Sequence, residues 1–176
     1  IVNDGSTDKT KHIIRLFKDS RIHYIENKTN LGEYPSRNIA LNNSKGKYIA
    51  IFDSDDISFP NRLLEQVEFL EKNINYVMIG SLADIIDKNS ICVGHAQSLS
   101  MSSEETKVFL LFRNCFTHSS LLYRKNILDK VRFNQEREIA SDFETIIKVA
   151  KFGDIKNLNK TLINYRNHKK SGSFKY

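Results

Sequence analysis

Three carboxylates occupy four consecutive positions of the sequence, at Asp53, Asp55 and Asp56, directly after the apolar run 49–52. Carboxylates this close repel one another, and their proximity raises their pKa values unless a cation compensates. A divalent cation such as Mg²⁺ or Mn²⁺ takes oxygen ligands and usually binds substrate phosphates as well. The bland alternative is a turn whose carboxylates cap the helix that Pro60 opens. The cluster alone therefore leaves a metal site and a capped turn open.

The elements that must position this cluster alternate along the chain. The pattern of apolar residues predicts strands over 21–25, 47–52, 76–83, 119–123 and 155–166, and helices over 8–19, 36–43, 60–70, 103–113 and 138–152. Such alternation predicts an α/β protein with a mixed, mostly parallel sheet flanked by helices. Ligands of these sheets lie beyond the carboxyl ends of the strands. Both the Asp53 cluster and the Asn3-Asp4-Gly5 turn fall at such ends.

The bulk composition limits the classes of protein. The 176 residues predict one domain, and no apolar run approaches the ~20 residues that cross a bilayer. A formal net charge of +6 suits an anionic ligand such as a diphosphate, or an anionic lipid surface, although a solvated Lys-rich surface explains it equally. Cys92 and Cys115 lack metal-site spacing and indicate free thiols in a reducing compartment, with a single disulfide between them as the alternative. No basic stretch interleaves aromatic residues, so no nucleic-acid partner is expected.

Three separate motifs carry a family resemblance. They are Val2-Asn3-Asp4-Gly5-Ser6-Thr7-Asp8, then Asn30-Leu31-Gly32 with Ser36-Arg37-Asn38-Ile39-Ala40, then Gly46 to Asp56 as GKYIAIFDSDD. In order and spacing they resemble the family 2 glycosyltransferases of the GT-A fold, which is Rossmann-like. Weaker likeness continues through Thr117-His118-Ser119-Ser120, Ser141-Asp142-Phe143-Glu144 and Tyr165-Arg166-Asn167-His168.

The resemblance implies a donor site for a nucleotide sugar, usually a UDP-sugar. Asp4 would hydrogen-bond the base, and Ser6 of the same turn would belong to the nucleotide site. Arg37 would meet the base or the phosphates, with a surface arginine on a short helix as the alternative. Asp53 would lie near the ribose.

The resemblance also implies a metal ion, Mn²⁺ or Mg²⁺, that bridges the diphosphate. Asp55, with Asp56, would hold this ion. His168 matches a late loop in which a histidine completes the metal site or contacts the diphosphate, although a histidine near a chain end is more often solvated.

The catalytic base implied by the resemblance is Asp142. It would take the proton from an acceptor hydroxyl whose oxygen attacks the anomeric carbon, with inversion in one displacement. A plain carboxylate at a helix start, favoured there by the helix dipole, is the alternative. Glu144 is the competing base. His118 could line the acceptor side, but a histidine packed at a strand edge is the simpler interpretation.

Family members carry a central first strand before the segment that matches Asn3-Asp4, and no counterpart of this strand is present here. A central strand pairs both of its neighbours, so we expect residues 1–176 to be one GT-A domain that lacks its first strand. Residues 1–100 would form the nucleotide-sugar half and 101–176 the acceptor and base half. The expected protein is a metal-dependent inverting glycosyltransferase of cell-surface polysaccharide or glycoconjugate synthesis. It would be cytoplasmic or at the inner face of the membrane, and its acceptor would be a glycan, a lipid-linked sugar or a protein. The alternative is a catalytically impaired nucleotide-sugar-binding module of a larger protein.

Overall fold

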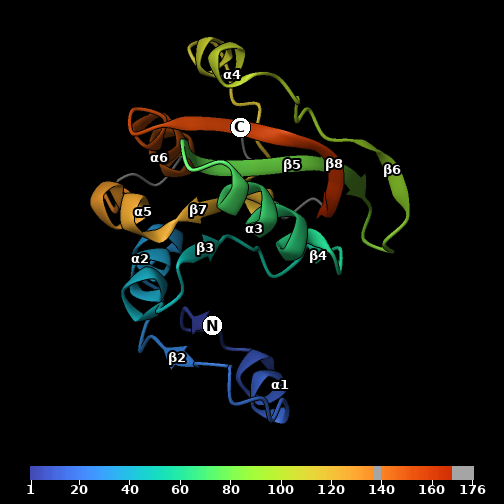
Figure 1. Cartoon of the computed structure of the whole chain (residues 1–176). Coiled ribbons are helices and arrows are strands. Elements are labelled where there is room, and N and C mark those ends of the chain that lie inside the picture. Colours follow the sequence, from blue (N-terminus) through green and yellow to red (C-terminus); the bar gives the residue numbers. More distant parts are fainter. Residues whose placement is uncertain (137–139, 168–176) are drawn as a thin grey trace.

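A computed structural model describes residues 1–136 and 140–167 of the chain. In chain order its elements are β1 (Val2–Asn3), α1 (Thr10–Leu16), β2 (Ile25–Glu26), α2 (Glu33–Asn43), β3 (Tyr48–Ala50), β4 (Ile57–Ser58), α3 (Arg62–Lys72), β5 (Tyr76–Ile86), β6 (Cys92–His95), α4 (Ser103–Phe109), a 3₁₀ turn (His118–Ser120), β7 (Leu122–Arg124), α5 (Lys125–Val131), α6 (Ser141–Val149) and β8 (Asp154–Arg166). Figure 1 shows a curled sheet surrounded by helices, with β1, β2 and α1 at the lower edge. The predicted α/β class with a mixed sheet flanked by helices is confirmed.

The main sheet has the strand order β3-β7-β5-β8-β4, and β6 pairs with the far part of β5. The long strands β5 and β8 pair in parallel from Tyr76 to Ile86, which makes them the centre of the sheet. Gly80 lies in this pairing, where an added Cβ would meet Asn157 Oδ1, Phe116 and Ser120 Oγ. The close approach of these side chains explains a glycine in the middle of a buried strand.

The strand directions differ in part from the expectation of a mostly parallel sheet. The pairs β1–β2 and β5–β8 are parallel, whereas β3–β7, β7–β5, β5–β6 and β4–β8 are antiparallel. β3, β5 and β8 do run in one direction, but β7 enters between β3 and β5 from their carboxyl ends. The 3₁₀ turn before β7 is therefore brought to the edge where the Asp53 cluster lies.

The two faces of the main sheet are covered by different helices. On one face, Leu70 and Val67 of α3 pack with Ile79 of β5 and Leu122 of β7. On the other face, the neighbouring strand residues Met78 and Tyr123 join a larger buried cluster, whose helix members include Leu41, Leu128, Ile146 and Val149. This division follows from the alternation of side chains along each strand.

The strands β1 and β2 form a small sheet of their own, and β1 does not pair with β3. A cavity of about 340 Å³ lies between the two sheets, lined by Val2, Ile25, Tyr48, Ile49 and Ala50 among others.

The helix and strand predicted in the first segments are longer than the elements that the structure contains. The helix expected over 8–19 is limited to Thr10–Leu16, and none of its residues is buried. The strand expected over 21–25 is replaced by a turn, because the Asp19 carboxylate accepts hydrogen bonds from the Arg21 N–H and guanidinium. The strand that follows is reduced to Ile25–Glu26. Local side-chain bonds thus outweigh strand propensity here.

Candidate functional site at the carboxyl edge of the sheet

The acidic cluster leaves the sheet directly after β3. The Ile51 N–H still donates to the Leu121 carbonyl at 2.9 Å, and the Asp53 N–H donates to the Ser119 hydroxyl at 3.1 Å. A turn follows, in which the Asp56 N–H donates to the Asp53 carbonyl. The cluster is therefore anchored to the 3₁₀ turn that precedes β7. The predicted position at a strand end is confirmed.

Asp53 forms an ion pair with Arg37 of α2. Arg37 Nη2 lies 2.6 Å from Asp53 Oδ1 and 2.7 Å from Glu33 Oε1, and only 15% of the arginine side chain is exposed. The guanidinium also lies over the Phe133 ring, 5.9 Å from its centroid. Burial acts to raise the pKa of Asp53, but the charges of Arg37 and His118 and the hydrogen bonds from Ser119 and Arg37 together outweigh it and hold the pKa below its usual value. Asp53 is consequently ionised and oriented before any ligand binds.

Asp56 is buried, with 7% of its surface exposed. Its Oδ1 accepts the Arg166 N–H at 2.7 Å, whereas Oδ2 has no hydrogen-bond partner among the residues that the structure describes. Burial raises the pKa of Asp56, and the charges of Asp55 and Asp53 add to this effect. Asp55 is exposed beside it, and its carbonyl accepts from the Arg166 guanidinium at 2.8 Å. Two adjacent carboxylates, one of them with an oxygen that no described residue bonds, favour the approach of a cation.

Asp4 lies at the end of β1 and holds the loop that leads into α2. Its Oδ1 accepts from Asn27 Nδ2 and from the Leu31 N–H, and its Oδ2 accepts from the Gly32 N–H, at 2.8–2.9 Å. Burial acts to raise the pKa of Asp4, but hydrogen bonds, that of Asn27 foremost, outweigh it and lower the pKa. Ser6 is exposed on the following turn, where its N–H donates to Asn3 Oδ1. Asp4 therefore fixes the start of α2, the helix that carries Arg37.

Asp142 lies at the start of α6, and its partner in space is His118. His118 Nδ1 is 3.8 Å from Asp142 Oδ2, and 10% of the histidine side chain is exposed. Burial and the charge of Arg37 lower the pKa of His118 to about 4, against the opposing charges of Asp142 and Asp53. The Tyr123 hydroxyl is also buried without a partner among the described residues, and burial together with Asp142 raises its pKa. Glu144, the competing base, is paired with Lys148.

The structure thus brings Arg37, Asp53 and Asp142 to one edge of the sheet, with His118 interacting with all three. Asp55 and Asp56 follow Asp53 in the same turn. Asp4 is linked to this group through α2, and Ser6 lies on the exposed turn beyond it. His168 lies outside the described residues. His118 is packed against Phe133, as the simpler interpretation of the sequence expected. Its position beside Asp142 had no signal in the sequence other than the polar run Thr117-His118-Ser119-Ser120 before a strand.

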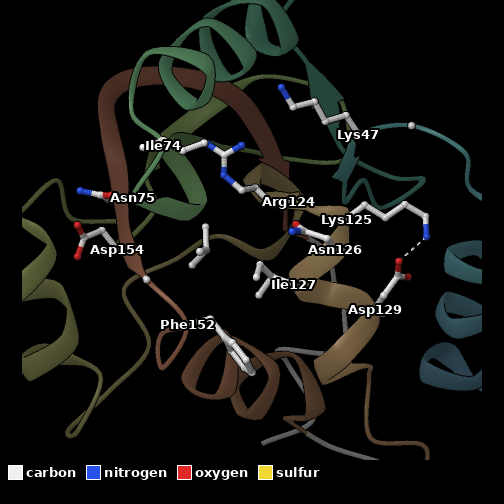
Figure 2. A pocket seen from close by; sticks show the side chains of 13 residues that line it. Lys47, Ile74, Asn75, Arg124, Lys125, Asn126, Ile127, Asp129, Phe152 and Asp154 are labelled. Carbon is white, nitrogen blue, oxygen red and sulfur yellow. Dashed lines mark hydrogen bonds and ion pairs between the residues drawn. The ribbon is translucent and has the colours of Figure 1, made fainter.

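A concavity also lies at the opposite edge of the sheet, where β3, β5 and β8 begin. Its volume is about 870 Å³, and Figure 2 shows the basic side chains Lys47, Lys125 and Arg124 in its wall. Each is already satisfied: Lys47 pairs with Glu71, Lys125 pairs with Asp129, and Arg124 donates to backbone carbonyls. The two lysines are thus held in ion pairs, and the Arg124 guanidinium ties the end of α3 to the start of β5.

A comparison with known protein families gives a match over most of the chain. Residues 1–132 match the model of glycosyl transferase family 2. The chain belongs to this family. An uncharacterized glycosyltransferase of Haemophilus influenzae is 33% identical to the family 2 chain over 179 residues, covering 96% of this chain and 55% of that protein. The UDP-Glc:alpha-D-GlcNAc-diphosphoundecaprenol beta-1,3-glucosyltransferase WfgD of Escherichia coli is 38% identical over 91 residues, covering 52% of this chain and 36% of that protein.

Solved structures show the same fold for this family 2 domain. S. aureus TarS 1–349 in complex with UDP-GlcNAc has a TM-score of 0.75 at 19% identity, covering 97% of this chain and 49% of that chain. The mannosyltransferase PcManGT of Pyrobaculum calidifontis, in complex with GDP-Man and Mn²⁺, has a TM-score of 0.70 at 16% identity, covering 97% and 48%. The predicted family and GT-A fold are confirmed. The chain spans about half the length of the curated relatives it matches.

The carboxylates of the acidic turn fit the divalent cation that the family implies. Within residues 1–136 and 140–167, no group of three or more His, Cys, Asp or Glu side chains could hold a metal ion by itself. Mg²⁺ in nucleotide sites, however, is usually bound by one or two carboxylates together with substrate phosphates. Asp55 and the unpaired Oδ2 of Asp56 provide such a partial set.

None of the helices within residues 1–136 and 140–167 combines the length and the apolar composition that crossing a membrane requires.

Proposed function

We propose that the protein transfers a sugar from a nucleoside diphosphate sugar, most simply a UDP-sugar, to an acceptor hydroxyl with inversion. The observation that carries this proposal is the convergence of Asp53 and Asp142 on His118 at the carboxyl edge of the sheet. Asp53 comes from the first hundred residues and Asp142 from the rest of the chain. Residues 1–100 thus supply the donor half of one domain and residues 101–176 the acceptor half.

The donor side uses acids that are fixed before ligand binds. Asp4 and Ser6 contact the nucleotide base region, and Asp53 accepts from a ribose hydroxyl. Arg37 orients Asp53 through their 2.6 Å contact and compensates part of its charge. Because the Asp53 carboxylate is already ionised and oriented, it loses little conformational freedom when it accepts a hydrogen bond from the ribose hydroxyl.

The metal side uses Asp55 and Asp56, with His168 as a further candidate beyond the described residues. When Mn²⁺ or Mg²⁺ is bound there, it stabilises the charge that develops on the departing diphosphate. The raised pKa of Asp56 indicates that a cation would relieve an existing electrostatic cost. PcManGT, a neighbour of similar fold, is in complex with GDP-Man and Mn²⁺, which supports this assignment.

The chemical step belongs to Asp142. Its carboxylate takes the proton of the acceptor hydroxyl while the hydroxyl oxygen forms a bond to the anomeric carbon. The bond from that carbon to the diphosphate oxygen breaks on the opposite face, and the diphosphate leaves with the electron pair. Because one displacement occurs, the anomeric configuration inverts.

The acceptor and its location follow from the relatives by analogy. WfgD acts on a sugar linked to diphosphoundecaprenol, so a lipid-linked acceptor in polysaccharide or glycoconjugate synthesis is our preferred class. Such an acceptor places the enzyme in the cytoplasm at the inner face of the membrane. A net charge of +6 suits an anionic lipid surface.

The test is a donor screen. UDP-glucose, UDP-GlcNAc and GDP-mannose are incubated with the protein, Mn²⁺ and a short lipid diphosphate-sugar acceptor, and released nucleoside diphosphate and product are measured. We expect one donor to be consumed and NMR of the product to show the inverted anomeric configuration. Retained configuration would refute the single displacement. Tight nucleotide binding with no turnover of any donor would instead support the impaired binding module.

A further inference from the structure

His118 is a largely buried histidine whose two ring nitrogens accept or donate no hydrogen bond within the part of the chain that the structure describes. Its imidazole packs edge-on against Phe133, with centroids 6.2 Å apart, and both Nδ1 and Nε2 lack a hydrogen bond among the described residues. A buried polar group without a partner costs about 1–3 kcal/mol. An apolar side chain could fill the same space without leaving buried polar atoms unbonded. The two nitrogens therefore indicate a partner that arrives when the site is occupied.

Charged groups from three elements surround this ring. Asp142 comes from the start of α6, Arg37 from α2, and Asp53 from the turn after β3, and all three act electrostatically on His118. Asp142 is nearest, with its Oδ2 at 3.8 Å from Nδ1, just beyond hydrogen-bond distance. The positive charge of Arg37 and the burial of the ring favour neutral imidazole, which carries one N–H donor and one acceptor.

Resting on the function proposed above, we propose that His118 is a positioning residue for the catalytic base. Its Nδ1–H donates a hydrogen bond to Asp142 when the donor nucleotide occupies the site, and this bond aims the carboxylate at the acceptor hydroxyl. The Asp142 side chain is 28% exposed and lies in the first turn of its helix, so rotation of the carboxylate can close the remaining gap. Phe133 limits the movement of the ring, which makes His118 the fixed member of the pair.

Two substitutions of His118 separate positioning from packing. Asn can place an amide N–H near the position of Nδ1, whereas Leu keeps apolar volume and removes the donor. In His118→Leu we expect kcat to fall about 10- to 100-fold, because small misplacements at a reacting centre have effects of this size. We expect His118→Asn to restore most of this loss. The Kd for UDP should change much less than kcat in both variants, because the proposed hydrogen bond is to Asp142 and not to the nucleotide. Equal losses in both variants, or a wild-type kcat in His118→Leu, would refute the role.

A second measurement does not depend on turnover. The ¹⁵N NMR spectrum of the labelled imidazole, recorded with UDP and Mg²⁺, should show neutral His118 protonated at Nδ1, with a signal that changes in Asp142→Ala. Protonation at Nε2, or no response to Asp142→Ala, would refute the positioning role even if no donor were consumed. Conversely, the predicted spectrum without any sugar transfer would contradict the proposed function while leaving the histidine–aspartate contact in place.

Discussion

Arg37 Nη2 lies 2.6 Å from Asp53 Oδ1, so an arginine that the sequence assigned to the ligand already holds an acid of the same site. The second partner of Arg37, Glu33, is an exposed residue of its own helix. The pair with Asp53 joins α2 to the turn after β3, and Asp4 fixes the start of α2. Hydrogen bonds of Asp4 and the Arg37–Asp53 ion pair thus connect the end of β1, through α2, to the acidic turn.

This connection predicts that substitution of Arg37 destabilises the protein more than substitution of its exposed partner Glu33. Arg37→Gln should lower the free energy of unfolding by about 1.5–3 kcal/mol, because it removes charged hydrogen bonds from a mostly buried side chain and leaves Asp53 uncompensated. Glu33→Gln is the control and should cost about 0.5 kcal/mol or less, because its side chain is 58% exposed. Urea unfolding at pH 7 measures both. Similar losses in the two variants would contradict a dominant Arg37–Asp53 pair.

Asp56 is predicted to weaken the metal-free fold at neutral pH. Its folded-state pKa is raised above the ordinary value of 3.8. Its contribution to stability is therefore fully present below pH 3.8 and is lost as the pH rises through the folded-state pKa. Asp56→Asn keeps the acceptor for the Arg166 N–H and removes the charge, so it should raise Tm at pH 7, by an amount that shrinks toward pH 4.

Thermal unfolding of metal-free protein between pH 4 and pH 8 tests this expectation, with Asp55→Asn as the exposed control. In saturating UDP and Mn²⁺ the wild-type protein should instead have a higher Tm than Asp56→Asn, because the ligand stabilises only a protein that binds it. A lower Tm for Asp56→Asn at pH 7 without metal would show that the carboxylate is already compensated.

Gly80 is predicted to be required for the junction of β5, β8 and the turn that carries His118. In Gly80→Ala the new methyl group would lie 2.9 Å from Phe116 Cδ1 and 3.0 Å from Ser120 Oγ, and closer still to Asn157 Oδ1. Overpacking of a filled core costs typically about 1–3 kcal/mol. Differential scanning calorimetry should show a lower Tm, and an unchanged Tm would mean that Asn157 moves aside at little cost.

Asp142 and Glu144 are neighbouring acids of α6 with different predicted effects. Asp142→Asn should lower kcat by about 10²- to 10⁴-fold, the usual contribution of a positioned general base, and leave UDP binding intact. Glu144→Gln removes an acid that is paired with Lys148 and should leave kcat within a few-fold of wild type. Steady-state kinetics with the donor found in the screen compare the two. A larger loss in Glu144→Gln would move the base to that residue.

The parts of this site that are local in sequence could be predicted from the sequence. The acidic turn was placed correctly because the apolar run before Asp53 is a buried strand, and strand ends of α/β sheets are where ligands bind. The family motifs gave the fold for the same reason, since they lie at strand ends and helix starts. The family and the fold are confirmed, whereas the roles of the individual residues stay predictions.

The contacts between distant residues could not be predicted. Whether Arg37 meets a ligand or Asp53 depends on how α2 packs against β3, and sequence spacing carries no information on that packing. The same holds for His118, which is buried by Phe133 and approached by Asp142 only in the folded chain. The sequence reasoning overestimated the share of parallel strand pairs. The direction of the short strand β7 is set by the sheet that it joins and has no local signature in the sequence.

Metal-dependent nucleotide binding by the acidic turn is the central claim, and calorimetric titration of UDP tests it most directly. The titration is made with Mn²⁺ and with excess chelator, on wild type, Asp55→Ala and the exposed control Ser54→Ala. We predict that wild type and Ser54→Ala bind UDP at least about 10-fold more tightly with Mn²⁺ than with chelator, and that Asp55→Ala loses this difference. Equal affinity of the wild-type protein for UDP with metal and with chelator would contradict the account.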